Sequence, residues 1–165
     1  MAHPLWSNIS SWFNRRTPLI QVLSELPLFS RLSVKELHEV EKIVHLRTYR
    51  AAETIFSAGD SGVAMYVILA GEVRIILISR DGTEQEIAVF AAGDLFGEMG
   101  LLDSSPRSAT ALAGTTTEVA AIARPDWIDL IHRHPAIGVG MLLPLAQMVA
   151  TRLRVANQAQ QEGSS

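Results

Sequence analysis

The chain has no cysteine among its 165 residues. Disulfide bonds and cysteine-based metal sites are therefore excluded, and we expect a cytoplasmic location. Basic residues are not in excess either, because 14 lysines and arginines stand against 17 acidic residues and give a net charge of −3. Proteins that hold nucleic acid through its phosphates normally carry a basic patch. We therefore expect this chain to make no direct contact with nucleic acid.

Long apolar runs are also missing. The longest candidate, residues 137–150, contains Pro144 and Gln147 and is shorter than the roughly 20 residues of a transmembrane helix. The N-terminus does not have the order of a signal peptide, because Arg15 and Arg16 follow its apolar residues. No P-loop, nucleophile elbow or metal-ligand spacing is present. These absences predict a protein that is not an enzyme and needs no metal or cofactor.

Aromatic residues are scarce, at 6% of the chain, and several of them fall near the N-terminus. Helical spacing places one apolar face there, made of Leu5, Trp6, Ile9, Trp12 and Phe13. We favour packing of this face on the barrel or on a second subunit, and membrane contact is the alternative. Further along, Ser33 and Glu36 match a capping box and predict a helix over residues 34–43.

Residues 44–123 have the pattern of β structure. Short apolar runs alternate with turn signals, of which Asp81-Gly82 predicts a hairpin. Such a pattern is typical of an antiparallel β-sandwich or barrel. The chain then returns to helix, with Asp126 expected to cap residues 127–132 and a longer helix expected over 137–157, kinked at Pro144. Together with the N-terminal helices, this predicts an α+β fold.

Residues 93–110 concentrate the side chains that suit ligand binding. Gly97 would let a ligand approach the backbone, and a helical turn that begins near Glu98 would offer N–H groups to an anion. Arg107 presents the fixed donors that a phosphate prefers, while the Glu98 carboxylate can accept hydrogen bonds from sugar hydroxyls. The structural alternative is a simple ion pair between Glu98 and Arg107.

Several motifs follow one another in a distinctive order. They are Pro27-Leu28-Phe29, Ala58-Gly59-Asp60, Gly71-Glu72-Val73, Asp81-Gly82, Gly93-Asp94, Phe96-Gly97-Glu98, Pro106-Arg107-Ser108-Ala109 and His134-Pro135. In this order and spacing, residues 28–153 resemble the cyclic-nucleotide-binding domain superfamily. The resemblance implies an antiparallel β-barrel of the jelly-roll type over residues 27–157, with two C-terminal helices. A helical extension (1–26) would precede it and a disordered tail (158–165) would follow.

The resemblance also implies a set of ligand contacts. Arg107 would pair with the cyclic phosphate and Glu98 with the ribose 2′-hydroxyl, while Ser108 and the N–H groups near Met99 and Ala109 would complete the phosphate site. The other candidates are Gly97 and Gly100 in the same segment, Val73, Ile75, Ile87 and Val89 beside the base, and Arg152, Asn157 and Thr151 on the last helix. Each of the four apolar residues would equally suit the core. The last helix is about one turn longer than the usual pattern.

The expected function is a stand-alone sensor that binds cAMP, with cGMP as the second choice of ligand. Binding would change the conformation of the last helix and thereby regulate an unidentified effector protein. The broad apolar surface of that helix also predicts a homodimer. Two alternatives remain open, a ligand-free dimerisation or interaction module and a regulatory fragment of a larger transcription factor, channel or enzyme.

Overall fold

A computed structural model describes residues 18–162, with side chains to residue 158. Its helices are α1 (Leu19–Glu25), the 3₁₀ turn η2 (Pro27–Phe29), α2 (Val34–Glu41), α3 (Glu98–Asp103), α4 (Arg124–Arg133) and α5 (Pro135–Glu162). Its strands are β1 (Val44–Tyr49), β2 (Thr54–Phe56), β3 (Ala64–Ala70), β4 (Glu72–Ile78), β5 (Glu84–Ala91), β6 (Leu95–Phe96), β7 (Thr110–Ala113) and β8 (Thr117–Ala123). The apolar face predicted for residues 5–13 lies outside the described residues.

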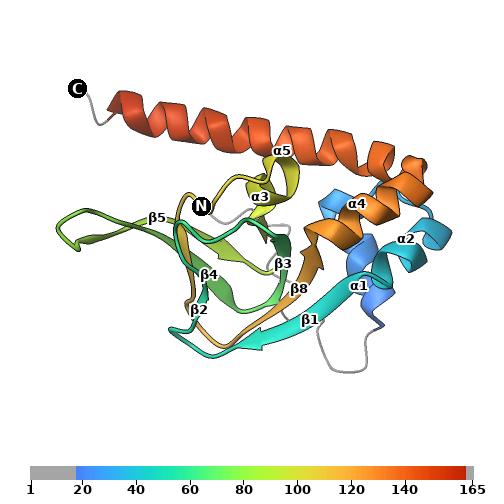
Figure 1. The fold of residues 1–165 in the computed structure, drawn as a ribbon, viewed down its shortest axis with the longest axis horizontal. Coiled ribbons are helices and arrows are strands. Elements are labelled where there is room, and N and C mark those ends of the chain that lie inside the picture. Colours follow the sequence, from blue (N-terminus) through green and yellow to red (C-terminus); the bar gives the residue numbers. More distant parts are fainter. Residues whose placement is uncertain (1–17, 163–165) are drawn as a thin grey trace.

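The strands form two antiparallel sheets of four strands each, in the orders β1-β8-β3-β6 and β2-β7-β4-β5. Figure 1 shows the two sheets facing each other as a barrel, with helices gathered at one end and α5 lying across the top. This arrangement confirms the predicted antiparallel jelly-roll barrel with N-terminal and C-terminal helices. Non-consecutive neighbours such as β3 and β8 also bring distant parts of the chain together.

Strand β3 packs against two hydrophobic clusters, one on each face of its sheet. Met65, Val67 and Leu69 pack into the cluster shared with the helices, whereas Ile68 packs between the sheets with Val73 and Val119. Successive side chains of a strand point to opposite faces, so a strand covered on both faces needs an almost continuous apolar run. The sequence Met65–Leu69 has such a run.

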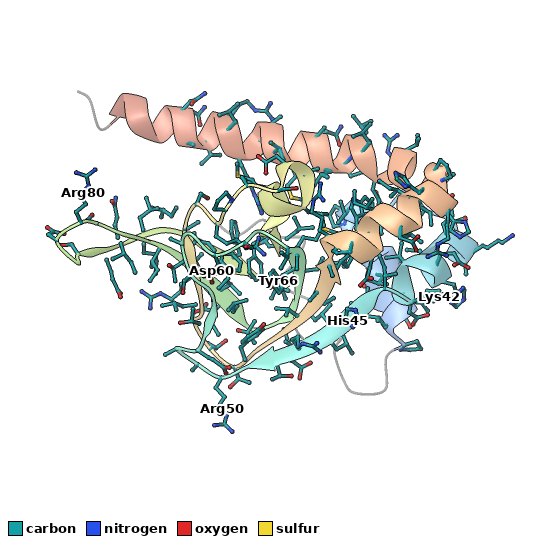
Figure 2. The ribbon with its side chains drawn as sticks, viewed as in Figure 1. Lys42, His45, Arg50, Asp60, Tyr66 and Arg80 are labelled. Carbon is teal, nitrogen blue, oxygen red and sulfur yellow. The ribbon has the colours of Figure 1, made fainter. Side chains whose placement is uncertain are left out.

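Strands β4 and β5 form the predicted hairpin, which protrudes from the barrel with Arg80 near its tip (Figures 1 and 2). Gly82 takes a φ of +84° and donates its N–H to the Ser79 carbonyl at 2.9 Å. The ladder contains a register shift between Ile75 and Ile76, where Ile87 is the extra residue of β5. This irregularity changes which side chains of β5 face the interior.

The N-terminal helices are part of the main core. Val22 and Leu23 of α1 are buried in the same cluster as β3 and α5. The predicted boundary at residue 27 therefore does not coincide with a break in packing. The capping box of α2 is confirmed, because Ser33 accepts from the Glu36 N–H while the Glu36 carboxylate accepts from the Ser33 N–H. The helix ends at Glu41, two residues before the predicted end.

The C-terminal helices depart from the prediction at three points. Helix α4 begins at Arg124 with Pro125 in its first turn, so Asp126 is inside the helix and the predicted Asp126 cap is wrong. Proline at this position is favoured because its fixed φ suits the first turn. Pro135 starts α5, and α5 continues through Pro144 to Glu162, into the segment predicted as a tail. The alanines and glutamines of that segment are compatible with helix.

Helix α5 is both long and apolar. By length and composition alone, residues 135–158 could cross a membrane, although polar residues interrupt the apolar run. Three of its side chains, Ile137, Met141 and Leu145, are buried in the protein core. Only 22% of its most apolar stretch is buried, so most of the helix surface is uncovered.

Candidate ligand-binding site

A cavity of about 200 Å³ opens between the barrel, the segment 97–109 and α5. Its lining includes nine of the predicted contacts, namely Ile75, Gly97, Glu98, Met99, Gly100, Arg107, Ser108, Ala109 and Arg152. Residues 97–109 form one wall, which we call the cassette, and Arg152 comes from α5. The fold therefore brings together residues 55 positions apart around one small space.

Arg107 is a buried cation, with 7% of its surface exposed. Its Nη1 donates to the Gly97 carbonyl at 2.8 Å, and its Nη2 donates to the Ala64 carbonyl at 2.6 Å. Its Nε is the only buried side-chain nitrogen or oxygen of the described residues that has no partner. Burial lowers the pKa of the guanidinium from its ordinary value. Such a group favours an anion that supplies the missing acceptor.

Two glycines allow the cassette to close against its surroundings. Gly97 has a φ of +73°, and a Cβ there would lie 2.7 Å from Nη1 of Arg107. Gly100 meets Gly62 so closely that a Cβ on Gly100 would lie 2.5 Å from the Gly62 Cα. Both positions need glycine, because a side chain would displace either the guanidinium or the backbone of the β2–β3 loop.

Glu98 is the buried anion of the site, with 5% of its surface exposed. It forms an ion pair with Arg152, whose Nη1 donates to Oε1 at 2.6 Å. Arg152 also donates to the Leu95 carbonyl and stacks over the Phe90 ring, with its Cζ 4.6 Å from the ring centroid. The alternative ion pair between Glu98 and Arg107 is therefore wrong, because each of them has other partners.

Five predicted contacts do not line the cavity. Val73 is fully buried in the core between the sheets. Ile87 and Val89 are about half exposed, because Val89 lies opposite Arg74 on the outer face and Ile87 occupies the bulge. Thr151 and Asn157 of α5 are both exposed.

Several lining residues were not predicted. The aromatic side chains of Phe56, Phe90 and Phe96 line the cavity, and Ser105 and Pro106 complete the cassette wall. Alternation along β5 puts Phe90 and Val89 on opposite faces, but it does not tell which of the two faces the cavity. Phe56 gave no signal, because it ends a three-residue strand.

Comparisons with known proteins agree with this geometry. The family described as "Cyclic nucleotide-binding domain" matches residues 46–134. The chain is 38% identical over 131 residues to the "Cyclic AMP receptor protein" of Thermus thermophilus, covering 79% of this chain and 59% of that protein. It is 34% identical over 123 residues to the "cAMP-dependent protein kinase regulatory subunit" of Aspergillus niger, covering 74% of this chain and 29% of that protein.

Among solved structures, a cyclic nucleotide-binding domain from Methylobacillus flagellatus superposes with a TM-score of 0.75 at 27% identity, covering 85% of this chain and 79% of that chain. The chain thus spans less than two thirds of the length of each of the two curated relatives above. The match of more than half of the chain, together with the buried Glu98 and Arg107 beside one cavity, places the chain in the cyclic nucleotide-binding domain family.

Proposed function

We propose that this chain is a sensor of cyclic nucleotides that prefers cAMP to cGMP, with Arg107 on the cyclic phosphate and Glu98 on the ribose 2′-hydroxyl. One observation carries the proposal. Two opposite charges, each more than nine-tenths buried, line the same cavity without pairing with each other. A cavity that offers one buried cation and one buried anion suits a ligand with both an anionic group and hydroxyl donors.

The preference for cAMP is supported by the relatives. Both curated relatives carry cAMP in their names. The contacts proposed for Ser108 and for the N–H groups near Met99 and Ala109 belong to this proposal. Ile75 and Phe90 supply the apolar surface against which a base could lie.

Arg152 offers a route from the ligand to α5. The Glu98 carboxylate has two oxygens and about four lone-pair directions, so it can bind Arg152 and a ribose hydroxyl together or exchange one for the other. Either event changes the contact that joins α5 to the cassette. Ligand binding would then shift the population of α5 positions, and an effector protein in the cytoplasm would respond to that shift.

Helix α5 has a second face that fits a homodimer. Exposed apolar or small residues recur at alternating intervals of three and four, namely Val139, Leu142, Ala146, Val149, Leu153 and Ala156. This is the a/d pattern of a coiled-coil seam, and we call it the α5 seam. Arg152 lies directly beside it in the sequence. We expect two copies of the chain to pair through this seam.

The central test is calorimetric titration of the intact chain with cAMP and cGMP. We expect cAMP to bind and Arg107→Ala to weaken binding about 100-fold, because two or more charge-assisted hydrogen bonds to phosphate are lost. Arg80→Ala, at the exposed hairpin tip, is the matched control and should keep wild-type affinity (Figure 2). Absence of binding by wild-type protein at millimolar nucleotide would refute the proposed function.

A further inference from the structure

The guanidinium of Arg107 lies on an aromatic surface that belongs to neither the cassette nor α5. Its Cζ is 4.1 Å from the centroid of the Phe56 ring and 5.7 Å from that of Tyr66. Phe56 ends β2 and Tyr66 belongs to β3, so the two rings come from different sheets. Figure 2 places Tyr66 within the barrel. We call Phe56, Tyr66 and Phe96 the aromatic platform.

Two rings of the platform are stacked, and the third, Phe56, is tilted against both of them. Tyr66 and Phe96 are directly opposite each other in the β3–β6 ladder, with ring centroids 5.1 Å apart and planes 17° apart. Phe56 lies 5.9 Å from each of them. Phe96 is 1% exposed and immediately precedes Gly97, whose carbonyl accepts from Arg107. The platform is therefore tied to the cassette by backbone as well as by packing.

The backbone also fixes Phe56 relative to Arg107. The loop that follows Phe56 forms two hydrogen bonds of 2.8 Å with Arg107, from Gly59 N–H to the Arg107 carbonyl and from Arg107 N–H to the Asp60 carbonyl. The ring and the guanidinium are thus held together although 51 residues separate them in the sequence. These backbone hydrogen bonds therefore place the Phe56 ring beside the guanidinium of Arg107.

The aromatic faces stabilise the buried charge of Arg107. Two carbonyls satisfy Nη1 and Nη2 of Arg107, but its Nε has no partner among the described residues and its charge is buried. The negative face of an aromatic ring stabilises a cation most strongly where water is excluded. A ring also keeps the guanidinium plane fixed, so the donors left for a phosphate have one orientation.

We propose that Phe56, backed by Tyr66, is a positioning residue for phosphate recognition, whose ring face holds the guanidinium of Arg107 ready for the cyclic phosphate. The inference rests on the proposed function and adds to it a residue outside the cassette. Phe56 acts through Arg107, so it should affect recognition of the phosphate and leave recognition of the ribose by Glu98 unchanged.

The test replaces Phe56 with phenylalanines that carry one, two or three fluorine atoms. Fluorine keeps the shape of the ring while it withdraws electron density from the ring face. We expect cAMP affinity to fall stepwise by about tenfold in total, as expected for loss of a desolvated cation–π contact. The same replacements at Phe29, a fully buried core residue away from the cavity, are the matched control and should leave affinity unchanged.

Ligand analogues separate positioning from packing. In the trifluoro variant, the affinity difference between the two phosphorothioate isomers of cAMP should shrink, whereas the affinity lost with 2′-deoxy-cAMP should equal the wild-type loss. The inference would be overturned if cAMP affinity did not change with the number of fluorines, or if the trifluoro variant changed both affinity differences equally. Either result would leave the proposed function intact. A wild-type chain that binds no cyclic nucleotide would overturn both.

Discussion

Arg107 and Arg152 line the same cavity, but the parts of the molecule that carry them are held in different ways. The backbone of Arg107 is hydrogen-bonded to the Gly59–Asp60 loop, and its guanidinium is fixed by two carbonyls and two rings. Arg152 lies on the second half of α5, where no described side chain beyond Leu145 is buried. That half reaches the rest of the protein through the partly buried Met148, which packs on the core, and through the side chain of Arg152.

The comparison distinguishes a region held by many contacts, which we call the fixed region, from a region held by few contacts, which we call the movable region. The cassette has many mutually supporting contacts, so its shape costs little to maintain when a ligand arrives. Segments with few buried apolar contacts open at low free energy and supply the moving parts of regulated proteins. We therefore expect α5 to change position around a cassette that stays fixed, and the predictions below test the two regions separately.

The largest effect should come from Gly97→Ala in the fixed region. The new Cβ would lie 2.7 Å from Nη1 of Arg107 and would also occupy a φ of +73°. We expect a stability loss of about 1–2 kcal/mol from the backbone and a loss of cAMP affinity of about 100-fold from displacement of the guanidinium. Thermal unfolding measures the loss of stability, and calorimetric titration measures the loss of cAMP affinity.

Gly82→Ala provides the matched control for that substitution. Gly82 has a φ of +84°, and no atom would lie within 4 Å of its Cβ. The two variants should therefore lose similar stability, while Gly82→Ala keeps the affinity of wild type. Equal affinities in both variants would show that the position of Arg107 does not depend on Gly97.

The second effect, of intermediate size, should come from Arg152→Met in the movable region. This change leaves the buried Glu98 without its cation, but the Arg152 side chain is 30% exposed, so we expect a stability loss of only about 1–2 kcal/mol. Hydrogen exchange should accelerate in residues 146–158 and stay unchanged in the cassette. Arg154→Met, also on α5 but exposed, is the control. Unchanged exchange in α5 would mean that other contacts hold the helix.

The fixed region was also the region that the sequence predicted well. Gly97, Glu98 and Arg107 lie within eleven residues, so local spacing is enough to place them beside one another. The hairpin and the capping box were equally local, since Asp81-Gly82 and Ser33–Glu36 each act within a single turn.

The sequence did not predict the contacts that depend on strand register or on residues far apart in the chain. The bulge at Ile87 changes the phase of β5, so Phe90 reaches the cavity in place of Val89. Phe56 joins Arg107 only because β2 pairs with β7. The Glu98–Arg152 pair spans 54 residues, and no local pattern distinguishes Arg152 from Asn157 as the residue that faces the cassette.

The smallest effect on ligand binding should come from the outer face of α5. Leu153→Glu places a charge at the α5 seam, where the side chain is 60% exposed in the single chain. We expect the homodimer to weaken by about tenfold or more in analytical ultracentrifugation, because two like charges would face each other at an apolar seam. Gln158→Glu adds the same charge away from the seam and should leave the dimer intact.

Affinity for cAMP measured on the Leu153→Glu monomer should stay close to wild type, because the cassette, the platform and Arg152 all belong to one chain. A large loss of affinity in that monomer would show instead that the partner copy completes the site, and the division into fixed and movable regions would then have to include the second subunit.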